Sequence, residues 1–392
     1  MLLHDDPAHA FMPYPAVPVA NAGSGPLAGL TFAVKDLFDV AGYPTSGGNP
    51  LLLALSGVKT ATAPTVQRLL DAGARFVGKV ITDELAFSMN GKNAHFGAPR
   101  NGAAPERIAG GSSCGSAAAV SNRQCDFALG TDTGGSVRAP ANHCGLYGIR
   151  PTHGRIALTR CLDLSPSFDT CGWFTRDAQT FARVADVLLG ADAAPIATPR
   201  LLRAADVWAL LGAEAQAALA PALGRIEAAF GPAQPALVAL DSFDTMYWSF
   251  RYLQGREAWN TDGSFITRYA PPLGPGVAER FAWSRNVSDA QVAAATAFRQ
   301  RFRAHLAALL GTDGVLVLPT MPDIAPLSSS SEAELEDYRN IAIQMLCSAG
   351  LAGLPQVSLP LATRLAAPLG LSLLGPAGSD RSLIAMAEQL GA

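Results

Sequence analysis

The sequence predicts an α/β protein built around one sheet, and three observations support this prediction. Short apolar strand patterns alternate with a helical pattern near the N-terminus, strand patterns return near the C-terminus, and no repeat or low-complexity linker separates the two parts. With 392 residues, 49% of them hydrophobic, the chain is long enough to bury a substantial core. We therefore expect a single domain over residues 1–392 with a helical insertion.

The first strand is predicted within residues 28–41. Leu30, Phe32 and Val34 alternate there with other residues, as in a strand that buries one face. Lys35 directly follows this alternation, so we expect its side chain to lie near the end of the strand.

A helix and a second strand are predicted next. Pro64 suits the first turn of a helix and Gly73 is a suitable C-terminal stop, with an apolar stripe between them. The apolar run at residues 76–81 then reads as a strand. This order of strand, helix and strand is typical of an α/β sheet.

The rest of the chain is predicted to be helical first and to return to strands later. Ala-rich helical patterns run from about residue 180 to about residue 230 and again over residues 289–310. Strands are expected at 314–319, 357–360 and 371–374, followed by a last helix from Ser379. We expect these C-terminal strands to rejoin the N-terminal sheet.

Charge and hydropathy exclude several classes of protein. With 29 basic and 32 acidic residues the formal net charge is −3, and no run of like charges occurs, so we expect no nucleic-acid partner. No apolar stretch reaches the roughly 18 residues that cross a membrane. The first ten residues lack the basic and apolar regions of a secretory signal, so we expect a cytoplasmic protein.

Cysteine and histidine spacing gives no sign of a metal site. The six cysteines form no CxxC pair, and the six histidines form no HxH or HxxxH pair. We therefore expect neither a disulfide framework nor a metal, and no cofactor.

Two glycine-rich serine turns carry the most chemical information. They cover residues 110–119 (GGSSCGSAAA) and 130–138 (GTDTGGSVR), and Ser136 follows Ser112 by 24 residues. Gly-rich loops ahead of helices often bind phosphate, but neither turn ends in GKS or GKT and no GxGxxG is present. A nucleotide site is therefore disfavoured.

A serine nucleophile needs a base within hydrogen-bond reach and backbone N–H groups that bind the developing oxyanion. Ser136 follows Gly134 and Gly135, which permit a bent backbone whose N–H groups converge on one point. No GxSxG motif and no evident histidine partner accompany Ser136. Residue spacing alone thus leaves a plain turn as the alternative.

Taken together, the two serine turns resemble the signature of the amidase-signature family, in which such segments recur at this separation. Six further segments resemble family motifs in the same order along the chain. They are AVKD at residues 33–36, NGKNAHFGAPRN at 90–101, GIRPTHG at 148–154, SFDTCGW at 167–173, LPTMP at 318–322 and AGLAGLPQVSLP at 349–360. The resemblance therefore extends from about residue 28 to the C-terminal helix.

The resemblance implies the amidase-signature fold, a single α/β/α domain with a mixed, twisted central sheet covered by helices. In such a fold the catalytic core motifs of this chain occupy residues 28–180. A variable helical region follows at about 180–312, and the C-terminal strands and helix occupy residues 313–392.

The resemblance also assigns roles to residues. Ser136 resembles the acylated nucleophile, Ser112 the bridging serine that a cis peptide bond precedes in the family, and Lys35 the terminal base. Asp132 and Arg138 resemble a supporting ion pair. The backbone N–H groups of the oxyanion hole correspond to Thr133, Gly134, Gly135 and Ser136.

Two of these assignments have rivals. Lys35 must be neutral to act as a base, and burial would have to lower its pKa from the ordinary value of about 10.4. Without the resemblance, Lys35 reads as a surface lysine paired with Asp36. Cys114 stands where the family commonly has Gly or Ser, so the Cys114 thiol is an alternative nucleophile to Ser136.

The expected reaction is hydrolysis of a small carboxamide to the carboxylic acid and ammonia through an acyl-enzyme. The segments at 89–101 and 167–177 most resemble plant-type indole-3-acetamide hydrolases, which favours an arylacetamide such as indole-3-acetamide. An aromatic segment at 247–265 would then wall a flat apolar pocket, with packing of a helical cap as the alternative. The pocket residues predicted on this basis are Tyr247, Trp248 and Trp259.

Other functions and substrates remain open at this point. Aliphatic or carboxylate-bearing amides are alternative substrates, and an ammonia-donating subunit of a tRNA-dependent amidotransferase is an alternative function. A non-catalytic receptor with the family fold is disfavoured, because the nucleophile, the bridging serine and the lysine are all present. The expected partner is a small-molecule amide, and a homodimer is one assembly that the sequence allows.

Overall fold

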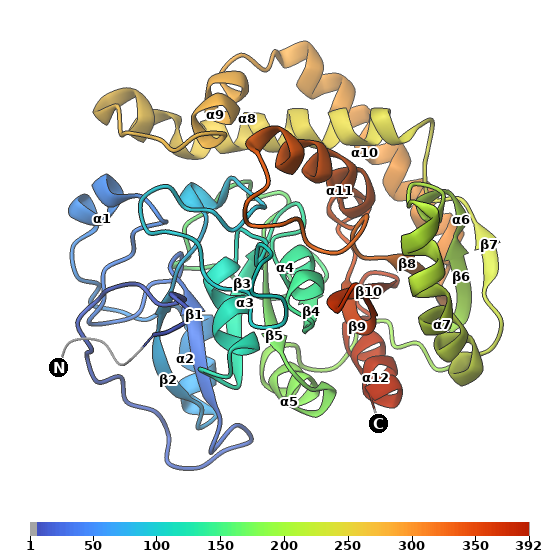
Figure 1. Ribbon diagram of the computed structural model, residues 1–392, viewed down its shortest axis with the longest axis horizontal. Helices are drawn as coiled ribbons and strands as arrows, with labels where there is room; N and C mark the ends of the chain where they lie inside the picture. The colour runs from blue at the N-terminus through green and yellow to red at the C-terminus, as the bar shows by residue number, and fades with distance from the viewer. Residues whose placement is uncertain (1–5, 392) are drawn as a thin grey trace.

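The computed structural model describes residues 6–391, whose ten strands form one sheet. Figure 1 shows how the strands and helices are arranged. Residues 1–5, the start of the N-terminal segment considered above, lie outside the described residues. The strand order across the sheet is β2-β1-β3-β5-β4-β9-β10-β8-β6-β7. The strands are β1 (Thr31–Lys35), β2 (Arg75–Val80), β3 (Phe127–Asp132), β4 (Tyr147–Arg150), β5 (Thr170–Thr175), β6 (Arg200–Ala204), β7 (Gln234–Ala236), β8 (Gly314–Pro319), β9 (Gln356–Arg364) and β10 (Ala367–Leu374).

The sheet is mixed, as expected from the sequence. Strand β1 is parallel to both β2 and β3, whereas β3, β5, β4, β9, β10 and β8 follow one another in antiparallel pairs. Strand β6 is parallel to β8 and to β7. Because β9 pairs with β4, the C-terminal strands do rejoin the N-terminal part of the sheet.

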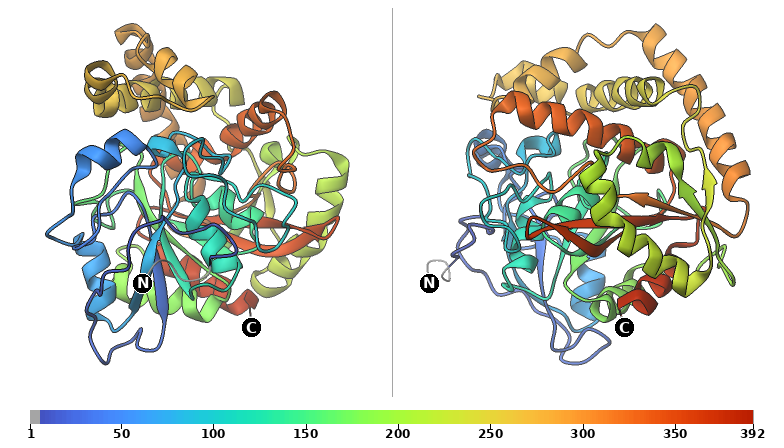
Figure 2. Two further views of the ribbon diagram at one scale, coloured as in Figure 1. Left: turned by 60° about the vertical axis from the view of Figure 1, so that its left-hand side comes forward. Right: turned by 45° about the vertical axis from the view of Figure 1, so that its right-hand side comes forward.

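Helices cover the sheet, and Figure 2 shows two groups of them at opposite ends of the molecule. Helices α8, α9, α10 and α11 pack together at one end, and α2, α5 and α12 lie at the other. The helices are α1 (Pro50–Ser56), α2 (Pro64–Asp71), α3 (Cys114–Ser121), α4 (Arg138–His143), α5 (Ala178–Leu188), α6 (Ala205–Trp208), α7 (Ala213–Phe230), α8 (Phe243–Tyr269), α9 (Val277–Ser284), α10 (Asp289–Leu310), α11 (Glu332–Ala352) and α12 (Asp380–Gly391), with one 3-10 turn at Glu84–Ala86.

The predicted N-terminal elements are confirmed to within a residue or two. Helix α2 begins at Pro64, and Gly73 follows it with a φ of +92°, a backbone conformation that favours glycine. Strand β2 ends one residue earlier than expected, at Val80.

The region from about residue 180 to residue 312 is less purely helical than predicted. Strands β6 and β7 interrupt it and form one edge of the sheet, where Arg200 of β6 lies opposite Gly314 of β8. The prediction missed these strands because they are short and have little apolar periodicity of their own. Strand β6 pairs with β8, more than a hundred residues later in the chain, and β7 pairs with β6, so both strands belong to the central sheet.

The two parallel strands β1 and β3 set the position of the serine turns. Carboxyl ends of parallel strands meet at the same edge of a sheet, so Lys35 at the end of β1 lies near Thr131 and Asp132 at the end of β3. Helix α3 follows the first serine turn and is buried from Cys114 through Val120. Its small side chains permit close packing, since a Cβ at Gly115 would lie 2.5 Å from the Ile81 nitrogen.

Candidate active site

Lys35 is fully buried and lies between the two serine turns. Its Nζ is 2.8 Å from the Ser112 Oγ and 2.8 Å from the Thr131 Oγ1. Thr131 was not identified from the sequence, although it lies one residue before Asp132 in the second serine turn. The structure thus joins Lys35 to one of the two predicted serines by a direct hydrogen bond.

The alternative of a surface lysine paired with Asp36 is wrong for this structure. Successive side chains of a strand point to opposite faces, so Asp36 turns away from Lys35. The Asp36 carboxylate instead pairs with Lys79 on β2 at 2.6 Å, and both side chains are fully buried. Tyr14 also donates its hydroxyl to Asp36 at 2.7 Å.

Burial lowers the pKa of Lys35 to about 8. The nearby charges of Asp83 and Asp169 act in the opposite direction and keep the pKa from falling further. A lysine with a pKa of about 8 is neutral in roughly one molecule in ten at pH 7, so an unprotonated amine is accessible under ordinary conditions.

The first serine turn has a cis peptide bond between Gly111 and Ser112. The Ser112 carbonyl accepts the Asp83 N–H at 3.0 Å, and the Asp83 carboxylate accepts the Gly91 N–H at 3.0 Å. A Cβ at Gly111 would lie only 2.1 Å from the Asp83 carboxylate, so glycine is needed there. These contacts orient the Ser112 side chain toward Lys35.

The second serine turn contacts the first through its backbone, because the Ser113 N–H donates to the Ser136 carbonyl at 3.3 Å. Asp132 organises this turn: its carboxylate accepts the N–H groups of Gly135 at 3.0 Å and Val137 at 3.1 Å. The predicted ion pair is present, with Arg138 Nη2 2.8 Å from Asp132 Oδ1.

Arg150 is a second cation on Asp132 that sequence reasoning missed. It lies 3.2 Å from the Asp132 carboxylate, and all three side chains of the group Asp132, Arg138 and Arg150 are fully buried. Burial alone would raise the pKa of Asp132, but the two guanidiniums hold it well below its usual range. Asp132 therefore stays ionised and fixes the backbone around Ser136.

The four predicted oxyanion donors are not equally available. The Gly135 N–H is bound to Asp132. The N–H groups of Thr133, Gly134 and Ser136 have no acceptor among residues 6–391. These three groups are thus free to bind a negatively charged oxygen beside Ser136.

Cys114 does not compete with Ser136 in this arrangement. Its thiol is fully buried and contacts the Ile81 carbonyl at 3.5 Å. Burial raises the pKa of this thiol well above its ordinary value, so the reactive thiolate is disfavoured.

Ser136 lies at a small cavity between the serine turn and the helices α8 and α11. The cavity volume is about 10 Å³, close to the least that holds one water molecule. Its lining combines apolar side chains with two polar ones from the helices, and consists of Ala86, Phe87, Ser88, Met89, Gly134, Ser136, Phe250, Gln254, Arg339 and Ile343.

The three aromatic residues predicted to wall the pocket do not line this cavity. Phe250 and Gln254 share one face of α8 because they are four residues apart, and this face is turned toward Ser136. Tyr247 binds Asn340, Trp248 is 39% exposed, and Trp259 lies under the Arg285 guanidinium. Of the aromatic residues in this segment, Phe250 lies on the side of α8 that lines the cavity. Composition alone does not show which side of the helix a residue occupies.

Arg339 and Ile343 on α11 were missed by the sequence reasoning. They too are four residues apart on one helix, and both line the cavity. Their spacing is the signal that marks a shared face, but only the tertiary structure shows what this face contacts.

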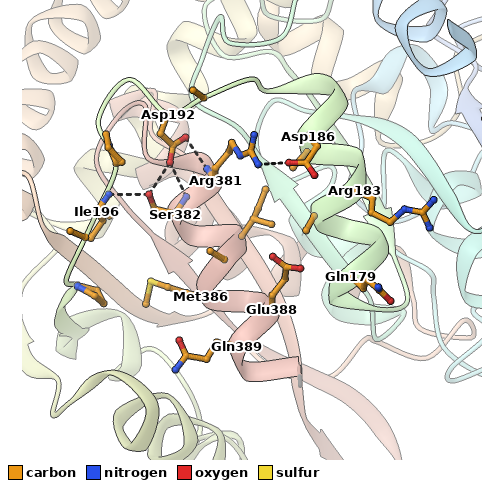
Figure 3. A pocket seen from close by; sticks show the side chains of 18 of the residues that line it. Gln179, Arg183, Asp186, Asp192, Ile196, Arg381, Ser382, Met386, Glu388 and Gln389 are labelled. Atoms are coloured by element: carbon orange, nitrogen blue, oxygen red, sulfur yellow. Dashed lines mark hydrogen bonds and ion pairs between the residues drawn. The ribbon is translucent and has the colours of Figure 1, made fainter. Parts of the chain in front are cut away.

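A wider surface pocket of about 700 Å³ lies elsewhere, between α5 and α12, and is shown in Figure 3. An ion pair between Arg381 and Asp186 and a hydrogen bond from Ser382 to Asp192 border it. Neither serine turn contributes to this pocket, so it is separate from the Lys35 site.

Within the described part of the chain, no group of three His, Cys, Asp or Glu side chains is arranged to hold a metal ion. Among the same residues, no helix is both long and apolar enough to cross a membrane.

The chain is similar to known amidases. The family model described as Amidase matches residues 16–214. Amidase 1 from Arabidopsis thaliana is 39% identical, over 96% of each chain, and chloroplastic outer envelope protein 64 from the same plant is 35% identical, over 95% of this chain and 67% of that protein. A solved amidase structure superimposes with a TM-score of 0.84 and 32% identity, covering 93% of this chain and 85% of that one.

Proposed function

This chain belongs to the amidase family and is an amide hydrolase, and we propose that it cleaves a small carboxamide through an acyl-enzyme on Ser136. The observation that carries the proposal is the buried contact of 2.8 Å between the Lys35 Nζ and the Ser112 Oγ, beside the turn that holds Ser136. The products are the carboxylic acid and ammonia.

In the proposed first step Ser136 attacks the amide carbonyl carbon. The Ser136 hydroxyl proton passes to the Ser112 oxygen while the Ser112 proton passes to neutral Lys35. The new C–O bond leaves a negative charge on the carbonyl oxygen, which the free N–H groups of Thr133, Gly134 and Ser136 would bind.

The remaining steps return the protons. Lys35 gives its proton through Ser112 to the amide nitrogen, the C–N bond breaks, and ammonia leaves an ester on Ser136. Water then loses a proton along the same route, attacks the ester and releases the acid. Neither step needs an oxidant, a reductant or a metal.

One candidate substrate is the arylacetamide class, such as indole-3-acetamide, which the sequence motifs favour. Phe87 and Phe250 support it, since both line the cavity at Ser136. The free volume of about 10 Å³ does not accommodate an indole ring, so binding would require movement of α8 or α11 side chains.

The test is ammonia release by the purified protein from a panel of amides. Activity of the protein alone would separate a free-standing amidase from an ammonia-donating amidotransferase subunit. A fluorophosphonate probe that labels Ser136 would separate an enzyme from a non-catalytic receptor.

Cytoplasmic location and a homodimer also stay predictions, to be checked by fractionation and by light scattering.

A further inference from the structure

We propose that Arg339 binds a carboxylate of the substrate, so that the preferred substrates are short amides that carry a carboxylate near the scissile carbonyl. This inference rests on the proposed amide hydrolysis at Ser136 and specifies its substrate class. It selects one of the alternatives that the sequence left open, in preference to a neutral arylacetamide.

The first support is the position of Arg339. It lines the same cavity as Ser136, its side chain is 4% exposed, and it is the one charged residue among the described residues that line this cavity. Its Nη1 donates to Glu336 at 2.9 Å, whereas its Nε is buried without a partner among residues 6–391. A buried N–H without an acceptor is costly, and a substrate carboxylate would supply the acceptor.

The second support is an excess of positive charge around Arg339. Arg251 and Arg280 are also buried, and the charge of Arg339 contributes to lowering the pKa of each. Among residues 6–391, the ion pairs of this group involve Glu336, at 2.9 Å from Arg339 and 3.5 Å from Arg280. The buried Asp83 carboxylate also acts on Arg280 and opposes the lowering of its pKa. Three guanidiniums and two carboxylates leave a net charge of 3 − 2 = +1, which an anionic ligand would reduce.

Other carboxylates nearby do not line the cavity at Ser136. Glu84, Glu279 and Glu332 line neighbouring pockets together with Arg280, and the buried Glu84 is bound by Asn49 and by the Gly274 N–H. Arg280 itself is held by the Phe87 carbonyl at 2.6 Å, which positions its charge behind the cavity wall. No carboxylate among residues 6–391 therefore lines the inner cavity beside Arg339.

Gln254 offers a matching contact for the amide end of the substrate. Its Oε1 is buried without a partner among the described residues, and its Nε2 would lie 3.6 Å from a Cβ at Gly134. An unpaired amide oxygen at this place is suited to accept an N–H of a primary carboxamide. Gln254 and Arg339 together would therefore recognise the two polar ends of one small molecule.

The cavity, as it stands, also requires movement of side chains before a carboxylate-bearing amide can enter. Ser136 and Arg339 border a free volume of only about 10 Å³, room for about one water molecule, so a short substrate that reaches both requires the smallest movement. A neutral amide would leave the Arg339 Nε unpaired, and sites built for a polar group reject analogues that lack it.

Steady-state kinetics with matched substrates test the proposal. Succinamate, which carries a carboxylate, is compared with succinamide of the same length, and with phenylacetamide and indole-3-acetamide. We expect kcat/KM for succinamate to exceed that for succinamide by roughly 10- to 100-fold. Equal values, or a preference for the neutral amides, would overturn the inference while leaving amide hydrolysis intact.

Substitutions at Arg339 show whether this residue is responsible. Arg339→Met should bring the ratio of the two kcat/KM values close to one, and Arg339→Lys should retain part of the preference, because it keeps the charge without the planar fork. Arg256→Met on α8 is the matched control, since Arg256 pairs with Asp289 away from the cavity and should leave the ratio unchanged. An unchanged ratio in a folded Arg339→Met protein would refute the assignment.

Calorimetric titration separates binding from turnover. Ser136→Ala protein should bind succinamate, and Ser136→Ala with Arg339→Met should bind it at least roughly tenfold more weakly. This result would support the carboxylate site even if the wild-type protein hydrolysed no amide, in which case the proposed function alone would fail. Equal binding by the two proteins would overturn the inference, with circular dichroism confirming that both are folded.

Discussion

The serine turns and the helices α8 and α11 face the same cavity, but they are held in different ways. The Lys35 amine and the Asp132 carboxylate each make several hydrogen bonds within the protein, and glycines permit the closest contacts. The Asp83 Oδ1 and the Arg150 Nε beside them are buried and unpaired within residues 6–391, as are the Gln254 Oε1 on α8 and the Arg339 Nε on α11. The difference is that Gln254 and Arg339 line the cavity at Ser136, where a ligand would meet them, whereas Asp83 and Arg150 do not.

The same contrast appears between two buried lysines on neighbouring strands. Lys79 on β2 contacts the Asp36 carboxylate at 2.6 Å, while Lys35 on β1 contacts only hydroxyl oxygens. An ion pair stabilises the charged form of a buried lysine. Uncharged hydroxyl groups offset the cost of burying that charge much less. Burial lowers the pKa of both lysines, and the contact with the Asp36 carboxylate opposes this effect at Lys79, so the uncharged hydrogen-bond partners of Lys35 favour the loss of its proton.

The largest effect is expected at the centre of the serine turns. Ser136→Ala should lower kcat by about 10⁴-fold or more, because Ser88, the other hydroxyl among the described residues that line the cavity, lies outside the two serine turns. Ammonia release and fluorophosphonate labelling measure this loss, and mass spectrometry identifies the labelled residue. A probe found on Cys114, or full activity of the mutant, would contradict the assignment of Ser136.

Removal of either relay residue should have the next largest effect. Lys35→Ala and Ser112→Ala should each lower kcat by about 10³-fold, since proton transfer loses its base or its bridge. In the double mutant the loss should be less than the product of the single losses, because the two residues act as a unit. Independent, fully multiplicative losses would show that no relay connects them.

A smaller effect is expected where the two regions touch. A Cβ at Gly134 would lie 2.8 Å from the Phe250 ring, so Gly134→Ala should displace α8 from the serine turn and lower kcat/KM by roughly 10- to 100-fold. Adding Phe250→Leu should restore part of the activity by making room. If Phe250→Leu restored no activity, the loss in Gly134→Ala would come from the backbone conformation at Gly134 and not from its contact with α8.

The pH dependence should follow the protonation of Lys35. Because the neutral amine is the active form and its pKa is about 8, kcat/KM should rise about tenfold between pH 7 and pH 9 and then level off. Lys59→Ala on the surface is the control and should show the same profile. A profile that is flat over this range would show that Lys35 does not set the rate.

The same pKa has a consequence for stability. The folded pKa is lower than the ordinary value of about 10.4, so the unfolded chain binds more protons between these two values. The free energy of unfolding should therefore gain a contribution from Lys35 as pH rises from about 8 to about 10.4. Denaturant titrations of wild type and Lys35→Met should show this gain only in the wild type.

The smallest effect is expected at the aromatic residues outside the cavity. Trp248→Leu should change kcat/KM for any amide by less than about threefold, as for a surface substitution away from the site. Phe250→Leu, on the cavity face of the same helix, should have the larger effect. A larger effect of Trp248→Leu than of Phe250→Leu would support the aromatic pocket that the sequence composition predicts.

The sequence by itself determined the parts of this protein whose signals are local. The alternation around Val34, the Pro64 and Gly73 boundaries of α2 and the two serine turns each depend on a few neighbouring residues, and the structure has the strands and the helix where the sequence predicted them. The family resemblance covered the same local motifs, which is why it indicated amide hydrolysis.

Only the tertiary structure decided which residues meet across long separations in the chain. Strand β6 pairs with β8, Arg150 joins Asp132, and Arg339 reaches the cavity of Ser136 from a helix some two hundred residues away. Such contacts depend on how elements pack, because a helix shows its spacing in the sequence but not the partner that its face will meet. The nature of the reaction was therefore readable from local motifs, while the residues proposed to select the substrate became visible only in the folded chain.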